Sequence, residues 1–318
     1  MPWLIGIDEA GYGPNLGPLV QTSVPLRVPN ADESIWDQLG KVIRKADGPP
    51  DARLLVDDSK KVNEGSQGFA RLERGMLAAL STDVVLPFSL GDLLRSYALG
   101  DSRPDLLREP WFDVTMVLPL EAKLETILTD GKGLQSGFTR RAYELGPIRG
   151  IVTPAPRFNQ LLEKWKNKSN VLAAGVIELL RANENLPGDE PIIYLIDKLG
   201  GRNYYAAMIA EAFPDGWVVA EREGPEICSY RIIGLPREIR LVFQPRADGT
   251  HFTVALASMA SKYLREVFMR QFNLWWLNHV PGIKPTAGYP GDAARFFKLI
   301  HAKMQALGFE DDAVWRRK

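Results

Sequence analysis

The sequence predicts an α/β fold in which strands and helices alternate around a buried sheet. Short apolar runs rich in β-branched residues alternate with longer segments whose apolar side chains recur at helical spacing. The chain has 318 residues, enough for one large domain or two modest ones. Hydrophobic residues make up 45% and charged residues 25%, which is typical of a globular protein and excludes a disordered or fibrous chain.

The first part of the chain begins with an apolar strand from Trp3 to Ile7, which ends at Asp8 and Glu9. Glycines then form a tight turn before the next strand. The further elements predicted here are strands over 19–28 and 84–88, a short apolar piece at 54–56, and helices over 33–45 and 69–80.

Residues 89–157 are rich in prolines and carry short strand-like runs such as 114–118. We interpret them as an insertion or small subdomain, so that residues 1–88 and 158–318 form one domain. Regular spacing then returns and predicts helices over 158–183, 203–213, 253–276 and 292–307, with strands over 191–197 and 217–220. The strand–helix–strand order of residues 191–220 implies a parallel pair.

Charge and cysteine content exclude several kinds of site. Lys plus Arg and Asp plus Glu are both 39, so a nucleic-acid contact would need a local basic patch. The single cysteine, Cys228, excludes an internal disulfide and a thiolate metal cluster, and three histidines argue against a multi-histidine metal site. The N-terminus lacks a basic segment before its apolar run, and no apolar stretch is long enough for a membrane span. We therefore expect a cytoplasmic protein without membrane contact.

Acidic residues follow two of the apolar strands. Asp8 and Glu9 close the first strand, and Asp197 closes the strand over 191–197. Ligands of open α/β sheets bind outside the carboxyl ends of strands, so these acids form a candidate site. A turn-forming or helix-capping role is the simpler alternative for each acid alone.

A fourth acid lies on the helix over 253–276. Ser258, Lys262 and Glu266 are spaced four residues apart and share a polar stripe of this helix. An exposed Lys–Glu pair is the alternative. Carboxylates without His or Cys suit Mg²⁺ or Mn²⁺. Two such ions about 3.5–4 Å apart activate a water and stabilise the leaving oxygen in phosphodiester hydrolysis.

Five sequence blocks follow one another in a specific order. They are Gly6-Ile-Asp-Glu-Ala-Gly-Tyr-Gly-Pro-Asn-Leu-Gly-Pro-Leu-Val20, Leu55-Val-Asp-Asp-Ser-Lys-Lys61, Leu195-Ile-Asp197, Ala257-Ser-Met-Ala-Ser-Lys-Tyr-Leu-Arg-Glu266 and Gly288-Tyr-Pro290. The first block resembles the N-terminal motif of type 2 ribonucleases H, the ribonuclease HII and HIII family. The others resemble that family's Asp-Ser-Lys motif, the strand with its third acid, its helix block and a late Gly-Tyr element.

The resemblance implies a ribonuclease H-like fold, a mixed sheet flanked by helices, here with an inserted subdomain. It also implies four catalytic acids that bind metal, namely Asp8, Glu9, Asp197 and Glu266. The implied activity is cleavage of RNA strands, or of single ribonucleotides, in duplexes with DNA, which leaves a 3′-hydroxyl and a 5′-phosphate. The implied cofactor is Mg²⁺ or Mn²⁺.

Substrate contacts are expected around these acids. The family's glycine turn and its late tyrosine read the ribose next to the cleaved bond, and cations near the acids hold phosphates. Charge balance of the acids is the alternative for the cations. The predicted substrate-binding residues are Gly11, Tyr12, Gly13, Ser59, Lys60, Lys198, Arg202, Lys262 and Tyr289.

The chain departs from the family at three places. Glu266 stands where ribonuclease HII has Asp, and Tyr12 stands where the turn commonly has Arg or Lys. Residues 89–157 have no counterpart in compact family members. We expect a monomeric endonuclease acting on nucleic acid. The alternatives are a nucleic-acid-binding protein of the same fold with weak or no catalysis, or a nuclease for another nucleic-acid structure.

Overall fold

The computed structural model of this chain describes residues 1–82 and 86–317. Within them the main sheet has eight strands in the order β5-β2-β1-β7-β10-β9-β8, and β6 also pairs with β2. The strands are β1 (Trp3–Ala10), β2 (Leu19–Arg27), β5 (Glu144–Leu145), β6 (Arg149–Thr153), β7 (Ile192–Asp197), β8 (Trp217–Arg222), β9 (Cys228–Ile233) and β10 (Ile239–Gln244). A separate parallel pair joins β3 (Ile43–Arg44) to β4 (Leu54–Leu55).

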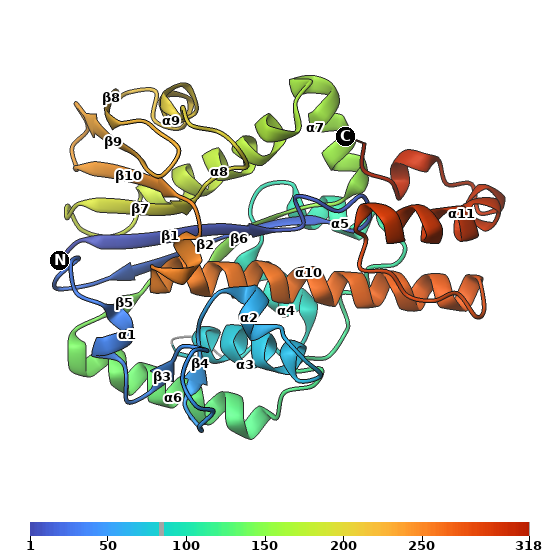
Figure 1. Cartoon of the computed structure of the whole chain (residues 1–318), viewed down its shortest axis with the longest axis horizontal. Helices are drawn as coiled ribbons and strands as arrows, with labels where there is room; N and C mark the ends of the chain where they lie inside the picture. The colour runs from blue at the N-terminus through green and yellow to red at the C-terminus, as the bar shows by residue number, and fades with distance from the viewer. Residues whose placement is uncertain (83–85, 318) are drawn as a thin grey trace.

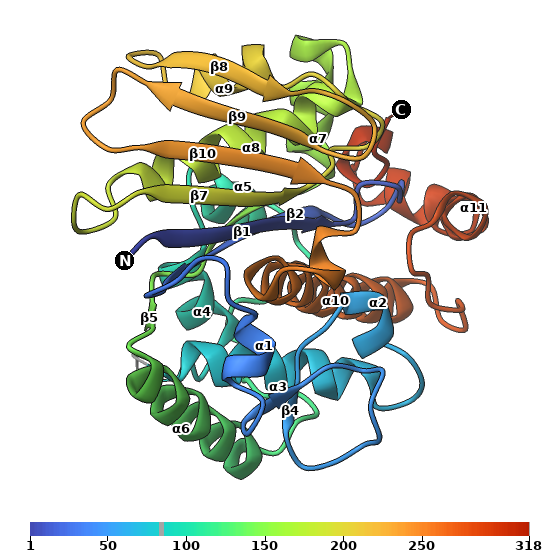
Figure 2. The same ribbon diagram turned by 60° about the vertical axis from the view of Figure 1, so that its left-hand side comes forward.

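The main sheet is mixed. β1 runs parallel to β7, and β7 runs parallel to β10. The pairs of β2 with β1, β5 and β6 are antiparallel, as are those of β9 with β8 and β10. Figure 2 shows the strands stacked from β8 to β2. The predicted mixed sheet flanked by helices is confirmed.

Helices cover both faces of this sheet (Figure 1). On one face lie α7 (Ala155–Trp165), α8 (Lys168–Glu184) and α9 (Ala206–Ala212), and on the other lies α10 (Phe252–His279). Beyond α10 lie α2 (Ser59–Val62), α3 (Gly68–Leu80) and α6 (Leu124–Arg141), and α11 (Pro290–Ala306) follows α10. The remaining helices are α1 (Ile35–Gln38), α4 (Leu90–Tyr97) and α5 (Ser102–Leu107). Among the described residues, no helix combines the length and apolar character that crossing a membrane requires.

The close contact between α10 and β1 depends on a glycine. A Cβ built on Gly6 would lie 2.1 Å from the backbone carbon of Thr253, so only glycine lets the helix start this close to the strand. The buried side chains of α10, such as Leu256, Ala260 and Leu264, then pack into the core on this side of the sheet. Because α10 crosses directly behind β1, its polar residues reach the end of that strand.

Several predicted elements are wrong or incomplete. The helix over 33–45 is reduced to α1, and the helix over 158–183 is two helices, because Lys166 takes a left-handed conformation and Asn167 caps a new start. Residues 114–118 form no strand, and the strand over 84–88 falls partly outside the described residues. The expected parallel pair of 191–197 with 217–220 is also wrong, since β10 pairs with β7 and β8 lies at the sheet edge.

Residues 89–157 include α4, α5, α6 and two strands of the main sheet. β5 and β6 both pair with β2, so part of this segment is continuous with the central sheet. The division of the chain into a domain and an insertion stays a prediction.

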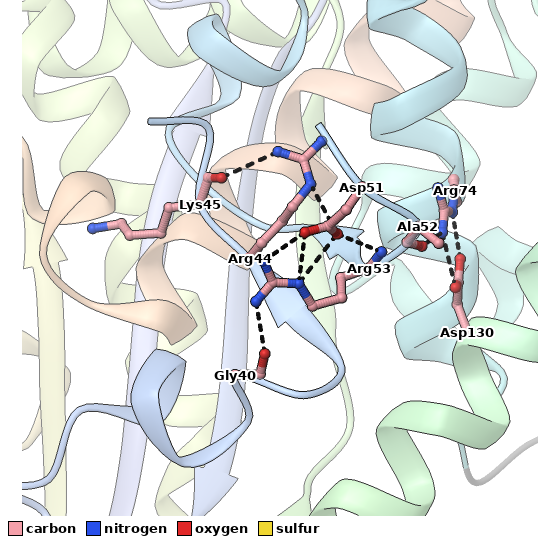
Figure 3. Close-up of polar contacts among 8 residues, drawn as sticks. All are labelled: Gly40, Arg44, Lys45, Asp51, Ala52, Arg53, Arg74 and Asp130. Atoms are coloured by element: carbon pink, nitrogen blue, oxygen red, sulfur yellow. Dashed lines mark hydrogen bonds and ion pairs between the residues drawn. The ribbon is translucent and has the colours of Figure 1, made fainter. Parts of the chain in front are cut away.

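A polar network holds residues 40–55 against this region (Figure 3). Arg53 donates to both Asp51 carboxylate oxygens, and its Nη1 donates to the Gly40 carbonyl at 2.7 Å. Arg74 of α3 forms an ion pair with Asp130 of α6, and its Nη2 donates to Ala52 O at 2.8 Å. These contacts fix the segment that leads into α2.

Candidate active site

The carboxyl ends of three neighbouring parallel strands carry the acids of the site. Ile7 of β1 pairs with Ile196 of β7, which places Asp8 and Asp197 at adjacent strand ends. Gln244 of β10 pairs with Asp197, and the chain then enters a short 3-10 turn, Ala247–Gly249. That turn brings Asp248 to the same edge of the sheet. The strand ends meet because parallel strands point the same way.

Asp8 and Glu9 lie within β1, because this strand continues to Ala10 and does not end at the predicted Ile7. Asp8 is only 7% exposed. Burial raises the pKa of its carboxyl well above the usual range, and the negative charges of Glu9 and Asp197 raise it further. Burial, followed by the charge of Asp197, also raises the pKa of Glu9 to about 7. These carboxylates are therefore destabilised in their charged forms.

Asp197 and Asp248 have the same kind of environment. Burial raises the pKa of Asp197, although backbone N–H groups, including that of Ala247 at 3.0 Å from Oδ1, oppose the shift. Burial and then the charges of Asp58 and Asp197 raise the pKa of Asp248 to about 6. Each of the four acids is thus within electrostatic reach of at least one other. Repulsion of this kind is relieved by a cation.

These four acids line one cavity of about 250 Å³. Its wall also contains the glycine turn, part of α2 and the polar stripe of α10. The lining residues are Asp8, Glu9, Ala10, Gly11, Tyr12, Gly13, Pro14, Ser59, Lys60, Asp197, Asp248, Ser258, Lys262, Arg265 and Tyr289. Of the nine predicted substrate-binding residues, seven are in this wall.

Glu266 is the predicted acid that the structure leaves out of the lining. Its carboxylate accepts a hydrogen bond from Lys262 Nζ at 2.6 Å, and Arg265 Nη1 lies 3.7 Å from the same oxygen. Lys262 itself lines the cavity. Lys262 and Glu266 thus form the ion pair that was the alternative interpretation of this stripe, although both side chains are partly buried, and Lys262 also lines the cavity. Asp248, which the sequence analysis missed, supplies the fourth carboxylate of the cavity.

The glycine turn and Tyr289 lie together on one side of the cavity. Gly11 has φ +95°, and a Cβ there would lie 2.5 Å from Pro18 O. The backbone N–H of Asn15 donates to Gly288 O at 2.8 Å, which ties the turn to the loop that carries Tyr289. Tyr289 is half exposed, so its ring is accessible.

Two of the four predicted cations line the cavity, namely Lys60 and Lys262, whereas Lys198 and Arg202 do not. Lys60 lines the cavity, and its charge acts on both Asp197 and Asp248. Lys198 instead donates to Asn203 Oδ1 and Gly224 O, each at 2.6 Å, outside the lining.

A cation stands next to Tyr12. Lys168 of α8 places Nζ 4.8 Å from the Tyr12 ring centre. Arg202 also acts on Tyr12, because its charge opposes the rise that burial causes in the pKa of that phenol. Arg202 itself lies outside the lining and donates to Asn170 Oδ1 at 2.6 Å.

The donor set fits a hard divalent cation in its chemistry. Four carboxylates face one cavity, and burial together with mutual repulsion opposes their ionisation. A bound Mg²⁺ or Mn²⁺ would favour the ionised carboxylates instead. Over residues 1–82 and 86–317, however, no three His, Cys, Asp or Glu side chains have an arrangement that could hold a metal ion. An ion shared by these acids would require their side chains to move closer together.

Three comparisons with known proteins were made, and similar proteins were found among solved structures. No family model matches the sequence, and no curated protein matches it. The ribonuclease HII of Archaeoglobus fulgidus, solved in complex with PCNA, is similar at 14% identity over 99% of this chain and 94% of that one, with a TM-score of 0.44. Ribonuclease H2 of Pyrococcus horikoshii is 14% identical over 98% of this chain and 92% of that one, with a TM-score of 0.46. Bst-RNase HIII in complex with Mn²⁺ is 15% identical over 99% of this chain and 66% of that one, with a TM-score of 0.41. All three are type 2 ribonucleases H, the family that the sequence motifs resemble.

Proposed function

We propose that this chain is a metal-dependent endonuclease of the ribonuclease H type. It hydrolyses RNA strands, or ribonucleotides embedded in DNA, within RNA·DNA duplexes, and it leaves a 3′-hydroxyl and a 5′-phosphate. The observation that carries the proposal is the cavity that collects Asp8, Glu9, Asp197 and Asp248 from three parallel strand ends. The resemblance of the sequence blocks supplies the substrate class.

Asp8, Glu9, Asp197 and Asp248 would hold Mg²⁺ or Mn²⁺. When bound, such ions activate a water and stabilise the leaving oxygen of a phosphodiester. Asp248 takes the place in this set that the sequence analysis gave to Glu266. Glu266 has a different part in the proposal, because its ion pair with Lys262 orients that ammonium group at the cavity wall.

The other residues of the wall bind and orient the scissile strand. Lys60 and Lys262 offer positive charge to phosphate oxygens beside the acids. The backbone of the glycine turn approaches the sugar closely, and Tyr289 stacks on it. The 2′-hydroxyl is the group that distinguishes RNA from DNA at such a site, so these contacts would set the specificity.

Cleavage of a panel of labelled duplexes tests the proposal. The panel holds an RNA·DNA hybrid, a DNA duplex with one ribonucleotide, an all-DNA duplex and a branched DNA, each with Mg²⁺, Mn²⁺ or EDTA. We expect cleavage of the first two substrates only, dependent on the metal, and loss of that cleavage in Asp8→Asn.

The other outcomes separate the alternative functions. Binding of the hybrid without cleavage would support a binding protein of this fold. Cleavage of branched DNA alone would support a nuclease with another substrate.

A further inference from the structure

The segment that follows α11 returns across the molecule to the glycine turn. Arg316, which is 1% exposed, donates from Nη2 to Gly11 O at 2.5 Å and also to Pro14 O. Its backbone N–H donates to Asn15 O at 2.8 Å, and Asn15 Nδ2 donates back to Arg316 O at 3.0 Å. Residues about 300 positions apart are thus joined by four hydrogen bonds behind the turn.

The same segment is anchored on its other side to α7. Asn159 Nδ2 donates to Trp315 O at 2.8 Å, and Asn159 Oδ1 accepts from Arg317 N at 2.8 Å. The guanidinium of Arg316 also lies over the Phe158 ring, 4.8 Å from its centre. Asn159 therefore fixes the backbone on both sides of Arg316, and the Phe158 ring lies against its guanidinium, so the group that binds the turn is itself held in place.

The two carbonyls that Arg316 binds control two peptide planes. A trans peptide is planar, so a fixed carbonyl also fixes the next N–H, which points the opposite way. The bond to Gly11 O therefore sets the direction of Tyr12 N–H, in the part of the turn that lines the cavity. The bond to Pro14 O sets Asn15 N–H, which donates to Gly288 O, the neighbour of Tyr289.

Arg316 is an unusual group to bury for packing alone. Among the described residues no carboxylate lies within ion-pair distance of it, and its Nε and Nη1 have no hydrogen-bond partner. Burial, followed by the charge of Arg265, lowers the pKa of its guanidinium to about 9. A buried cation without an acid is costly, which favours a role that an apolar side chain would not perform.

A second guanidinium braces the next part of the same loop. Arg265 Nη2 donates to Leu16 O at 3.4 Å and to Ala287 O at 2.8 Å. Arg265 lines the cavity and has Glu266 beside it, whereas Arg316 lies outside the lining and has no acidic partner in the part of the chain that the structure describes. A substitution of Arg316 therefore tests the support of the turn alone, since it removes no group from the cavity wall.

We propose that Arg316 is a positioning residue that holds the glycine turn and the Tyr289 loop in the geometry needed to recognise the ribose. This inference rests on the proposed function. Arg316 acts through the peptide planes of the turn and does not touch the substrate. Its loss should therefore weaken recognition of the ribonucleotide much more than it slows the bond-breaking step.

The test compares Arg316→Ala, Arg316→Lys and the control Arg317→Ala on a DNA duplex with one ribonucleotide. Loss of two charge-assisted hydrogen bonds should raise KM in Arg316→Ala by roughly tenfold or more and leave kcat within about threefold. Lysine carries the charge without the planar fork, so Arg316→Lys should restore only part of the effect. Arg317, whose side chain is 46% exposed, should be replaceable without effect. Added methylguanidinium should lower the KM of Arg316→Ala.

Hydrogen exchange separates failure of this inference from failure of the proposed function. In Arg316→Ala, exchange of the backbone N–H groups of residues 11–13, 15 and 16 should quicken while that of β10 stays unchanged, whether or not the wild type cleaves anything. Wild-type exchange and KM in Arg316→Ala would overturn the inference. If Arg316→Ala instead lowers kcat and raises KM to the same extent on every substrate, and exchange quickens throughout the protein, the role of Arg316 is purely structural and the inference is also overturned. If Arg316→Ala does not fold, wild-type KM and exchange in Arg316→Lys overturn it instead.

Discussion

The single buried acid Glu73 and the acids of the candidate active site have opposite surroundings. Glu73 of α3 is fully buried, and its carboxylate accepts from the backbone N–H groups of Leu120, Glu121 and Ala122 at 2.7–2.8 Å and from Tyr263 OH at 3.0 Å. Four donors satisfy a single charge. That carboxylate holds a loop of the predicted insertion against the core, and no further ligand is needed there.

The acid cavity is the reverse case. Asp8 accepts a hydrogen bond from Glu9 N at 2.8 Å, yet the nearest charges on it are the negative charges of Glu9 and Asp197. Hydrogen bonds therefore compensate for the burial of the Glu73 carboxylate, whereas at the cavity the neighbouring acids add to the cost of burying a charged carboxylate. The comparison indicates that a buried acid signals a cation site when its neighbours are acids.

The largest expected difference between the two regions is in catalysis. Asp8→Asn should reduce cleavage of the RNA·DNA hybrid by roughly a thousandfold or more, because a metal-binding carboxylate is lost. Glu73→Gln should keep the wild-type kcat per folded molecule. Steady-state kinetics on both variants checks this, and an active Asp8→Asn would refute the mechanism.

Stability should change in the opposite sense. Glu73→Ala leaves three buried N–H groups without a partner and should lower the free energy of unfolding by about 3 kcal/mol or more. Asp8→Asn relieves repulsion and should hold or raise it in the absence of metal. Urea unfolding in EDTA measures both, with the exposed Glu64→Ala as the control expected within about 0.5 kcal/mol of wild type. A Glu73→Ala variant as stable as the wild type would remove the contrast.

The pH dependence of the metal-free protein should reveal the acid cavity. The folded-state pKa of Glu9 is about 7, against an ordinary value of 4.5, so the folded state binds the proton more tightly than the unfolded state. The stability that this carboxyl contributes is complete below pH 4.5 and is lost as the pH rises through 7, by an amount on the order of 3 kcal/mol.

Thermal unfolding in EDTA across this range checks the sign. Glu9→Gln should flatten the decline, and saturating Mn²⁺ should remove it. A wild type whose stability rises from pH 4.5 to 7 by the same amount as that of Glu9→Gln would contradict the shift.

The smallest effect should come from the half-exposed side of the cavity. Tyr289→Ala removes a ring that packs near Arg265 and should reduce discrimination in favour of a ribonucleotide by roughly tenfold, with duplex binding changed less. Cleavage of a continuous hybrid is compared with cleavage at a lone ribonucleotide. Equal losses on both, with the fold disturbed, would instead favour a packing role.

The sequence predicts the parts of the site whose signal is local. An apolar run that ends in acids identifies β1 and β7, and the long helical pattern identifies α10. Asp248 depends instead on β10, whose residues alternate between buried and exposed, and on a parallel pairing to β7 that no local pattern specifies. The alternation in residues 239–244 was the available signal.

Glu266 shows the limit of spacing arguments on a helix. It shares a stripe with Ser258 and Lys262, and Ser258 does line the cavity. Two turns farther along, the same stripe has moved past the strand end, and the Glu266 carboxylate meets Lys262 instead. Periodicity specifies a face, but the place where that face passes the sheet edge depends on how α10 packs on β1.

Metal affinity in two matched variants tests the central claim most directly, that the fourth acid is Asp248. Mn²⁺ is titrated calorimetrically into Asp248→Asn and Glu266→Gln, each of which removes one carboxylate charge at similar volume. We predict that Asp248→Asn weakens Mn²⁺ binding by roughly tenfold or more, while Glu266→Gln stays within about twofold of wild type. Weakened binding in Glu266→Gln with wild-type binding in Asp248→Asn would contradict the site described here.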